Sequence, residues 1–244
     1  MQPVLALTFR HYVVWSRKLP VFLCLYVLGP AILLYGLGVA FGLDAKLAFV
    51  IPGVMVNSVV VAGFIACSYG AMERFYAHRY ESWMAATMNV WQIVLAEALF
   101  QGIKGVITAA GIFVAGALMG GPANPLLLLL AAPVLMLLGT CGAMLGYCLV
   151  ALARSYDDIT LSEPLTTAAF VFSGVFAAVS LFPLPIQIFA YLLPIYHGIE
   201  LVRPLFTGVL PSVAMLALHA AALLGMTCGS YVVAARLFQR RLLG

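Results

Sequence analysis

Charge is scarce in this sequence. Asp, Glu, Lys and Arg make up 8% of the 244 residues, whereas a typical soluble domain carries about 25%. Hydrophobic residues account for 65%, and the mean hydropathy is +1.12. Several apolar runs exceed the roughly 20 residues that a helix needs to cross a bilayer core. These properties exclude a water-soluble fold.

Motifs for catalysis and nucleotide binding are also lacking. The three lysines, Lys18, Lys46 and Lys104, do not follow the glycine frame of a P-loop, in which backbone amides and a lysine hold phosphates. The four histidines are far apart, and the five cysteines form no CxxC pair or metal-ligand spacing. We therefore expect no catalytic site, no metal site and no cofactor bound by this chain.

The net charge of +4 does not indicate nucleic-acid binding. The basic residues lie between apolar runs and at the chain ends, where membrane topology and anionic lipid headgroups account for them.

What the sequence does contain is a series of apolar segments separated by short polar turns. This pattern predicts an all-α membrane protein that forms a single domain, residues 1–244, with six transmembrane helices. The first apolar run is too long for a signal peptide and should remain as a helix. The predicted spans are residues 20–43, 47–71, 91–119, 126–153, 165–181 and 211–235.

Two further segments lie outside these spans. Residues 182–208 are divided by prolines into pieces too short to cross, which predicts short re-entrant helices at the outer face. Residues 4–19 form a helical pattern with Arg10, Arg17 and Lys18, together with His11, on one arc and mostly aromatic and aliphatic residues opposite. We interpret this pattern as an amphipathic helix in the membrane interface. The alternative is the packed first turn of a longer helix.

The distribution of Lys and Arg predicts which side the termini occupy. With six spans, nine of these residues lie in the N-terminal segment, the 2–3 loop, the 4–5 loop and the C-terminal tail, against two on the opposite side. The positive-inside rule then places both termini in the cytoplasm.

The most polar part of the chain is residues 72–90. Its charged residues alternate with aromatic ones, which gives more exposed aromatic surface than a loop requires and suits docking to a partner protein. A solvated loop is the alternative. The residues concerned are Glu73, Arg74, His78, Arg79, Glu81 and Trp83. A second cytoplasmic loop carries Arg154, Asp157 and Asp158.

Charged residues also occur within or beside the spans. Glu97 and Lys104 lie seven residues apart on one face of the third span, and an intramembrane charge is costly unless it is paired, hydrated or snorkelling. A functional or helix-pairing role and simple snorkelling both remain open. His197, Glu200 and Arg203 follow at i, i+3 and i+6, close enough to interact along one helix at the outer face. An ordinary interfacial loop is the alternative.

These features resemble the membrane permeases of type-2 ATP-binding-cassette (ABC) exporters, within the NodJ-like branch. The resemblance covers nearly the whole chain and rests on the order and spacing of several motifs. They are LAFVIPGVMVNSVV (47–60), LAEALFQGIKG (95–105), ARSYDDITL (153–161), FSGVF (172–176), LPIYHGIELVRPLFTG (193–208) and RRLL (240–243). One departure is Thr87-Met88, where such permeases often have a threonine–proline pair.

The resemblance implies a permease in a bacterial inner membrane that works as a dimer. Each copy would dock one cytoplasmic ABC ATPase subunit, which binds ATP and Mg²⁺, through residues 72–88. The implied cargo is a lipid-linked or acylated oligosaccharide or polysaccharide. Export of drugs or other small amphipathic molecules, including haem-type cofactors, is the alternative. A third hypothesis is an intramembrane lipid-modifying enzyme with His197, Glu200 and Arg203 as its site.

Overall fold

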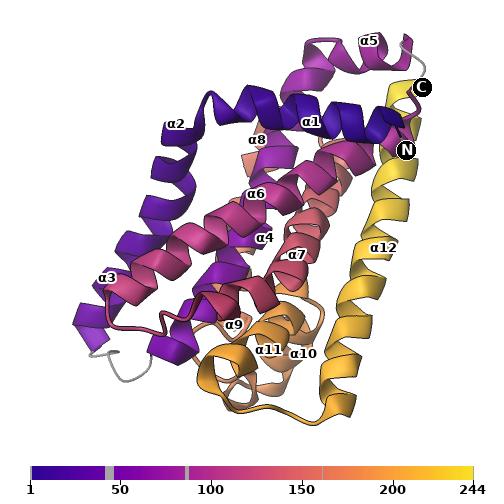
Figure 1. The fold of residues 1–244 in the computed structure, drawn as a ribbon. Helices are drawn as coiled ribbons and strands as arrows, with labels where there is room; N and C mark the ends of the chain where they lie inside the picture. The colour runs from indigo at the N-terminus through magenta and orange to yellow at the C-terminus, as the bar shows by residue number, and fades with distance from the viewer. Residues whose placement is uncertain (1, 42–46, 86–87, 161, 244) are drawn as a thin grey trace.

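A computed structural model describes residues 2–41, 47–85, 88–160 and 162–243. Every regular element in these ranges is a helix, and the helices pack into one elongated bundle (Figure 1). The prediction of an all-α membrane protein is confirmed at this level. The short connection between the first two predicted spans, residues 44–46, lies outside the described residues.

Four helices are long and apolar enough to cross a membrane. They coincide with the second, third, fourth and sixth predicted spans. Helix α4 continues five residues past the predicted end, and α12 runs eight residues past its predicted end. Their bounds are α4 Leu47–Tyr76, α6 Val90–Leu118, α7 Pro125–Leu152 and α12 Val213–Leu243.

Helices α4 and α7 form the centre of the bundle and touch backbone to backbone. A Cβ added at Gly142 would lie 2.3 Å from the carbonyl oxygen of Val60, and one added at Gly63 would lie 2.5 Å from that of Gly139. Such distances are far below van der Waals contact, so only glycine permits this approach. Helices α6 and α12 both pack on α7 and also contact each other (Figure 1).

The first predicted span is helical but not uniform. Helix α2 (Leu19–Leu23), the π-helix η1 (Cys24–Leu28) and α3 (Gly29–Phe41) follow one another without a break. Pro30 has no N–H, and its ring crowds the carbonyl one turn earlier, which accounts for the widened π turn just before it.

Helix α1 (Gln2–Ser16) runs across the end of the bundle rather than along it (Figure 1). Its inner face packs on α6, where the Thr8 hydroxyl donates to the Ala96 carbonyl at 3.1 Å. Leu5 and Phe9 are exposed on its outer face. The geometry fits an interfacial helix, although His11, which the sequence placed with the water-facing cations, is turned inward.

The fifth predicted span, residues 165–181, is not one helix. Helix α9 covers Ser162–Phe172 and ends before Gly174, whose φ of +92° does not continue a helix. A single 3-10 turn, η3 (Val179–Leu181), follows after an irregular stretch. The predicted continuous helix is therefore wrong: the chain breaks where the glycine turns it.

Two short helices follow this break, as the prolines predicted. Helices α10 (Leu184–Tyr191) and α11 (Pro194–Thr207) meet at an angle of 84°. If this bent pair counts as one crossing, the described residues provide up to five spans by length and composition. The number six and the re-entrant course of this pair remain predictions.

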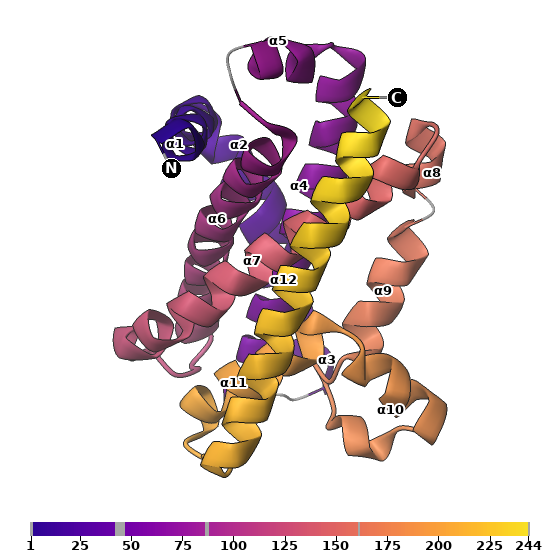
Figure 2. The same ribbon diagram turned by 90° about the vertical axis from the view of Figure 1, so that its right-hand side faces the viewer.

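The two ends of the bundle differ. Helix α5 (Arg79–Ala85), α8 (Tyr156–Thr160), α1 and the C-terminal end of α12 gather at one end, and α10 and α11 lie at the other (Figures 1 and 2). Polar segments 72–90 and 154–160 are thus together at the end that carries both chain termini.

Candidate functional site

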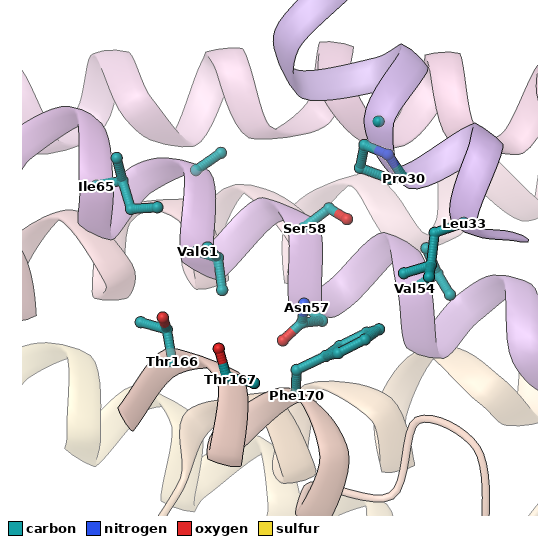
Figure 3. Close-up of a pocket in the computed structure, with 12 residues that line it drawn as sticks. Pro30, Leu33, Val54, Asn57, Ser58, Val61, Ile65, Thr166, Thr167 and Phe170 are labelled. Atoms are coloured by element: carbon teal, nitrogen blue, oxygen red, sulfur yellow. The ribbon is translucent and has the colours of Figure 1, made fainter. Parts of the chain in front are cut away.

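A groove with a volume of about 370 Å³ opens between α3, α4 and α9. Apolar side chains such as Leu33 and Phe170 form much of its wall, and Asn57, Ser58 and Thr167 supply polar atoms. Figure 3 shows the side chains of Asn57 and Thr167 turned into the same space between α4 and α9. The described residues that line it include no Asp, Glu, Lys or Arg.

The groove presents hydrogen-bond acceptors. The side-chain oxygen of Asn57 is buried and has no hydrogen-bond partner among the described residues. The hydroxyls of Thr166 and Thr167 donate to the carbonyl of Glu163, at 2.9 and 3.0 Å. Their oxygens therefore remain available as acceptors. A buried amide oxygen without a hydrogen bond is unusual in proteins and costs about 1–3 kcal/mol.

A second cavity adjoins the groove and has a different chemistry. It measures about 100 Å³ and shares Val61 and Thr166 with the groove. Its remaining wall is apolar and comes from α4, α7, α9 and the start of α11, including Phe64, Leu145 and Ile195. A groove that carries several polar side chains and a cavity lined by hydrocarbon thus meet along one face of α4.

The described part of the polar segment 72–90 begins with a corner rather than an extended loop. Helix α4 continues to Tyr76, the chain turns at His78 with a φ of 53°, and α5 begins at Arg79. Glu73, His78, Arg79 and Glu81 are exposed, and Trp83 is half-buried. His78 and Glu81 lie 2.8 Å apart on the surface, where an ion pair contributes little to stability.

Arg74 does not belong to that exposed surface. Its guanidinium donates to the Glu97 carboxylate at 2.7 Å and, through Nε, to the Tyr80 hydroxyl at 3.2 Å. The Tyr147 hydroxyl also donates to Glu97, and Tyr80 and Tyr147 lie 3.2 Å apart at their hydroxyls. Arg74 was predicted to face a docking partner. It points inward because α4 runs one turn further than expected.

Helix α1 contributes to the same cluster. Nε2 of His11 lies 3.3 Å from Oε1 of Glu97, and its ring stacks on Phe100 and meets Trp83 edge-on. The guanidinium of Arg10 lies over Trp83 at 5.6 Å. Side chains of α1 and α5 are therefore in direct contact.

Glu97 and Lys104 are both buried in α6 but face different partners. Glu97 is paired with Arg74, so a helix-pairing role describes it better than snorkelling does. The ammonium of Lys104 lies 4.9 Å from the ring centre of Phe22 and 5.7 Å from that of Phe100. These cation–π contacts join the first span to α6.

His197, Glu200 and Arg203, which the sequence predicts at the outer face, do not form one site. Arg203 donates to the carbonyls of Gly174 at 2.5 Å, Val175 at 3.2 Å and Phe49 at 3.2 Å. It also lies 3.7 Å above the Phe49 ring. Arg203 thus supplies donors to two carbonyls in the irregular stretch after α9 and ties that stretch to the start of α4.

His197 has a separate partner that sequence reasoning missed. Its Nδ1 lies 3.0 Å from Nδ1 of His219 on α12, and its Nε2 is 3.0 Å from the Tyr191 carbonyl. Both imidazoles are buried beside Tyr196. The hydrogen bonds of His197 and Arg203 thus go to different elements, which removes the basis for a joint lipid-modifying site.

The second polar loop is ordered by one carboxylate. Asp158 accepts from the backbone N–H groups of Arg154 at 2.6 Å and Ser155 at 3.2 Å, which holds the pKa of Asp158 below its ordinary value. Asp157 lies beside it in the first turn of α8. At the N-terminal end of the chain, Arg17 and Lys18 are exposed, as an interfacial helix requires.

Comparison with known proteins agrees with these features. The model of the ABC-2 type transporter family matches residues 2–207. Nodulation protein J of Rhizobium leguminosarum bv. trifolii is 31% identical over 208 residues, 82% of this chain and 79% of that protein. Nodulation protein J of R. leguminosarum bv. viciae is 29% identical over 248 residues, 98% and 95% of the two chains. The counterpart from Sinorhizobium fredii is 29% identical over 245 residues, 96% and 92%.

No solved structure matches the chain significantly. The family match and the curated relatives nevertheless agree over nearly the full length. Proteins of this family are membrane subunits without an ATPase site of their own, and they work with a separate ATPase subunit. The chain therefore belongs to the ABC-2 type transporter family, as a multi-pass membrane permease subunit of an ABC exporter.

Proposed function

We propose that this permease exports an acylated oligosaccharide, or a similar lipid-linked glycan, across a bacterial inner membrane. The observation that carries this proposal is the buried, unpartnered side-chain oxygen of Asn57 in the groove between α3, α4 and α9. Together with the acceptor oxygens of Thr166 and Thr167, it suits a cargo rich in hydrogen-bond donors. Sugar hydroxyls and amide N–H groups are such donors.

The lack of charge in the groove favours a neutral glycan over a cationic drug. A carboxylate is the partner that most strongly stabilises a bound cation, and the described lining contains none. The adjoining apolar cavity accommodates the start of an acyl chain, since it is lined almost entirely by hydrocarbon. A molecule with a hydroxylated head and a hydrocarbon tail matches both compartments at once.

The exposed part of segment 72–90 would dock the ATPase. Glu73, His78, Arg79 and Glu81 lie at its surface beside the half-buried Trp83. The ATPase would bind ATP and Mg²⁺ and drive the spans of two permease copies. The positive-inside rule places this end, with both termini, in the cytoplasm.

Transport by inverted membrane vesicles tests the cargo. The chain is co-expressed with an ABC ATPase subunit from the same genome, and ATP-dependent uptake of a fluorescent, N-acylated tetramer of N-acetylglucosamine is measured. Asn57→Leu should lower uptake by about tenfold, because a lost hydrogen bond to a buried group is worth roughly 1.5 kcal/mol. Ser68→Ala, on the same helix but outside both cavities, is the matched control.

The outcomes separate the alternatives. If the vesicles take up hydrophobic drugs and not the acylated tetramer, the cargo is the alternative one. If Asn57→Leu transports the tetramer as well as the wild type does, the groove is not its path. The docking surface is tested separately by Arg79→Glu, which should prevent co-purification of the ATPase while the permease itself remains folded.

A further inference from the structure

One buried carboxylate collects side chains from several helices. Glu97 on α6 accepts from Arg74 on α4 and from Tyr147 on α7, and Nε2 of His11 on α1 lies 3.3 Å away. Tyr80 on α5 joins the same cluster through Arg74 and Tyr147. We call these five residues the Glu97 cluster.

The Glu97 cluster lies where the docking corner joins the spans. Arg74 is in the last turn of α4, and Tyr80 is in the first turn of α5. Tyr80 is buried, whereas its neighbours Arg79 and Glu81 are exposed. Tyr80 thus links α5 directly to α4 and α7 inside the bundle. Phe238 of α12 packs edge-on against both Tyr80 and Tyr147, at 5.0 Å each.

Stability alone does not explain a buried ion pair at this point. Well-packed apolar residues of similar volume usually stabilise a fold as well as a buried ion pair does, because burying two charges is costly. Charged and hydroxyl groups, in contrast, fix distances and directions between helices through their hydrogen bonds. The Glu97 cluster therefore specifies how α1, α4, α5, α6 and α7 are placed relative to one another.

We infer that Glu97 is a positioning residue that couples the ATPase-docking helix α5 and the interfacial helix α1 to the spans α6 and α7. A push on α5 moves the Tyr80 hydroxyl, and the hydrogen bonds of Tyr80 and Arg74 transmit that movement to Glu97. The contact with His11 extends it to α1. This inference rests on the proposed function, since it assumes an ATPase docked at α5.

The test measures coupling separately from assembly. The permease is purified with its ATPase, reconstituted into vesicles, and assayed for the amount of complex, the ATP hydrolysis rate and export of the acylated tetramer per ATP. Glu97→Gln should retain the complex and lower export per ATP by roughly fivefold or more, the lower end of typical coupling energies. Glu163→Gln changes an exposed acid on α9 and is the matched control.

A double variant keeps the test decisive if single variants fold poorly. Glu97→Met alone leaves the Arg74 guanidinium without its carboxylate partner, whereas Arg74→Met with Glu97→Met removes both charges at once. Tyr147 keeps the Tyr80 hydroxyl as a hydrogen-bond partner in this double variant, so it should fold better than Glu97→Met alone. We expect this double variant to assemble and hydrolyse ATP with little export. Export per ATP equal to the wild type in the double variant or in Glu97→Gln would overturn the inference. A wild-type complex that neither forms nor exports would instead contradict the proposed function.

Discussion

Arg203 offers the sharpest test of how the broken fifth segment is held. Its buried guanidinium donates to the carbonyls of Gly174, Val175 and Phe49. Arg203→Met keeps much of the side-chain volume but takes the side-chain donor away from the buried carbonyls of Gly174 and Val175. Each such loss costs about 1–3 kcal/mol, and the relieved burial of the charge offsets part of the sum. A net loss of about 3 kcal/mol in the free energy of unfolding follows.

Arg203→Lys separates charge from geometry. A lysine keeps the positive charge, but its single ammonium lacks the planar fork that reaches several carbonyls at once. We expect this variant to lose about half as much stability as Arg203→Met. Arg236, which is exposed on α12, supplies the matched control as Arg236→Met.

Thermal unfolding in detergent measures these losses through the buried cysteines. Cys67 and Cys141 become reactive toward a thiol dye when the bundle opens, and the exposed Cys24 and Cys228 are first replaced by serine. For a chain of this size, 3 kcal/mol corresponds to a fall in midpoint of roughly 6–12 °C. An unchanged midpoint in Arg203→Met, or a midpoint for Arg203→Lys equal to the wild type, would refute the reasoning.

Three further predictions concern the interior and the polar loop. Gly142→Val should abolish correct folding, seen as loss of the monodisperse peak in size-exclusion chromatography, because its Cβ would overlap the Val60 carbonyl. In the histidine pair, His197→Ala and His219→Ala should each lower the thermal midpoint. The double variant should lose less than the sum, because each single variant leaves the other imidazole without its partner. Asp158→Ala should speed amide hydrogen exchange at the backbone N–H groups of Arg154 and Ser155, which donate to this carboxylate in the wild type. In the wild type, the slow exchange of these two N–H groups should persist at neutral pH and be lost only when the pH falls below the lowered pKa of Asp158.

The long helices could be predicted from the sequence because hydropathy alone determines them. Helix α6, for example, begins at Val90 and ends at Leu118, within one residue of the predicted span at each end. The break after α9 could not be predicted in this way. It depends on the positive φ of Gly174 and on the hydrogen bond that Arg203, distant in sequence, donates to the Gly174 carbonyl.

The candidate sites show the same division between local and long-range information. The polarity of segment 72–90 was visible in the sequence, but the inward direction of Arg74 depends on where α4 ends. Helical spacing placed His197 and Arg203 near each other, whereas their partners come from α12 and from the start of α4. Asn57 and Ser58 are two polar residues in an apolar run, and their place in a groove appears only when α9 packs opposite them.

The glycine contacts between α4 and α7 also restrict how this protein can change shape. Two helices whose backbones touch cannot rotate or slide past one another without steric overlap, so we expect them to move as a single rigid body. Alternating access would then depend on the peripheral helices swinging around this fixed pair. A cross-link between α4 and α7 should consequently be harmless to turnover, whereas one that ties α9 to α4 should arrest it.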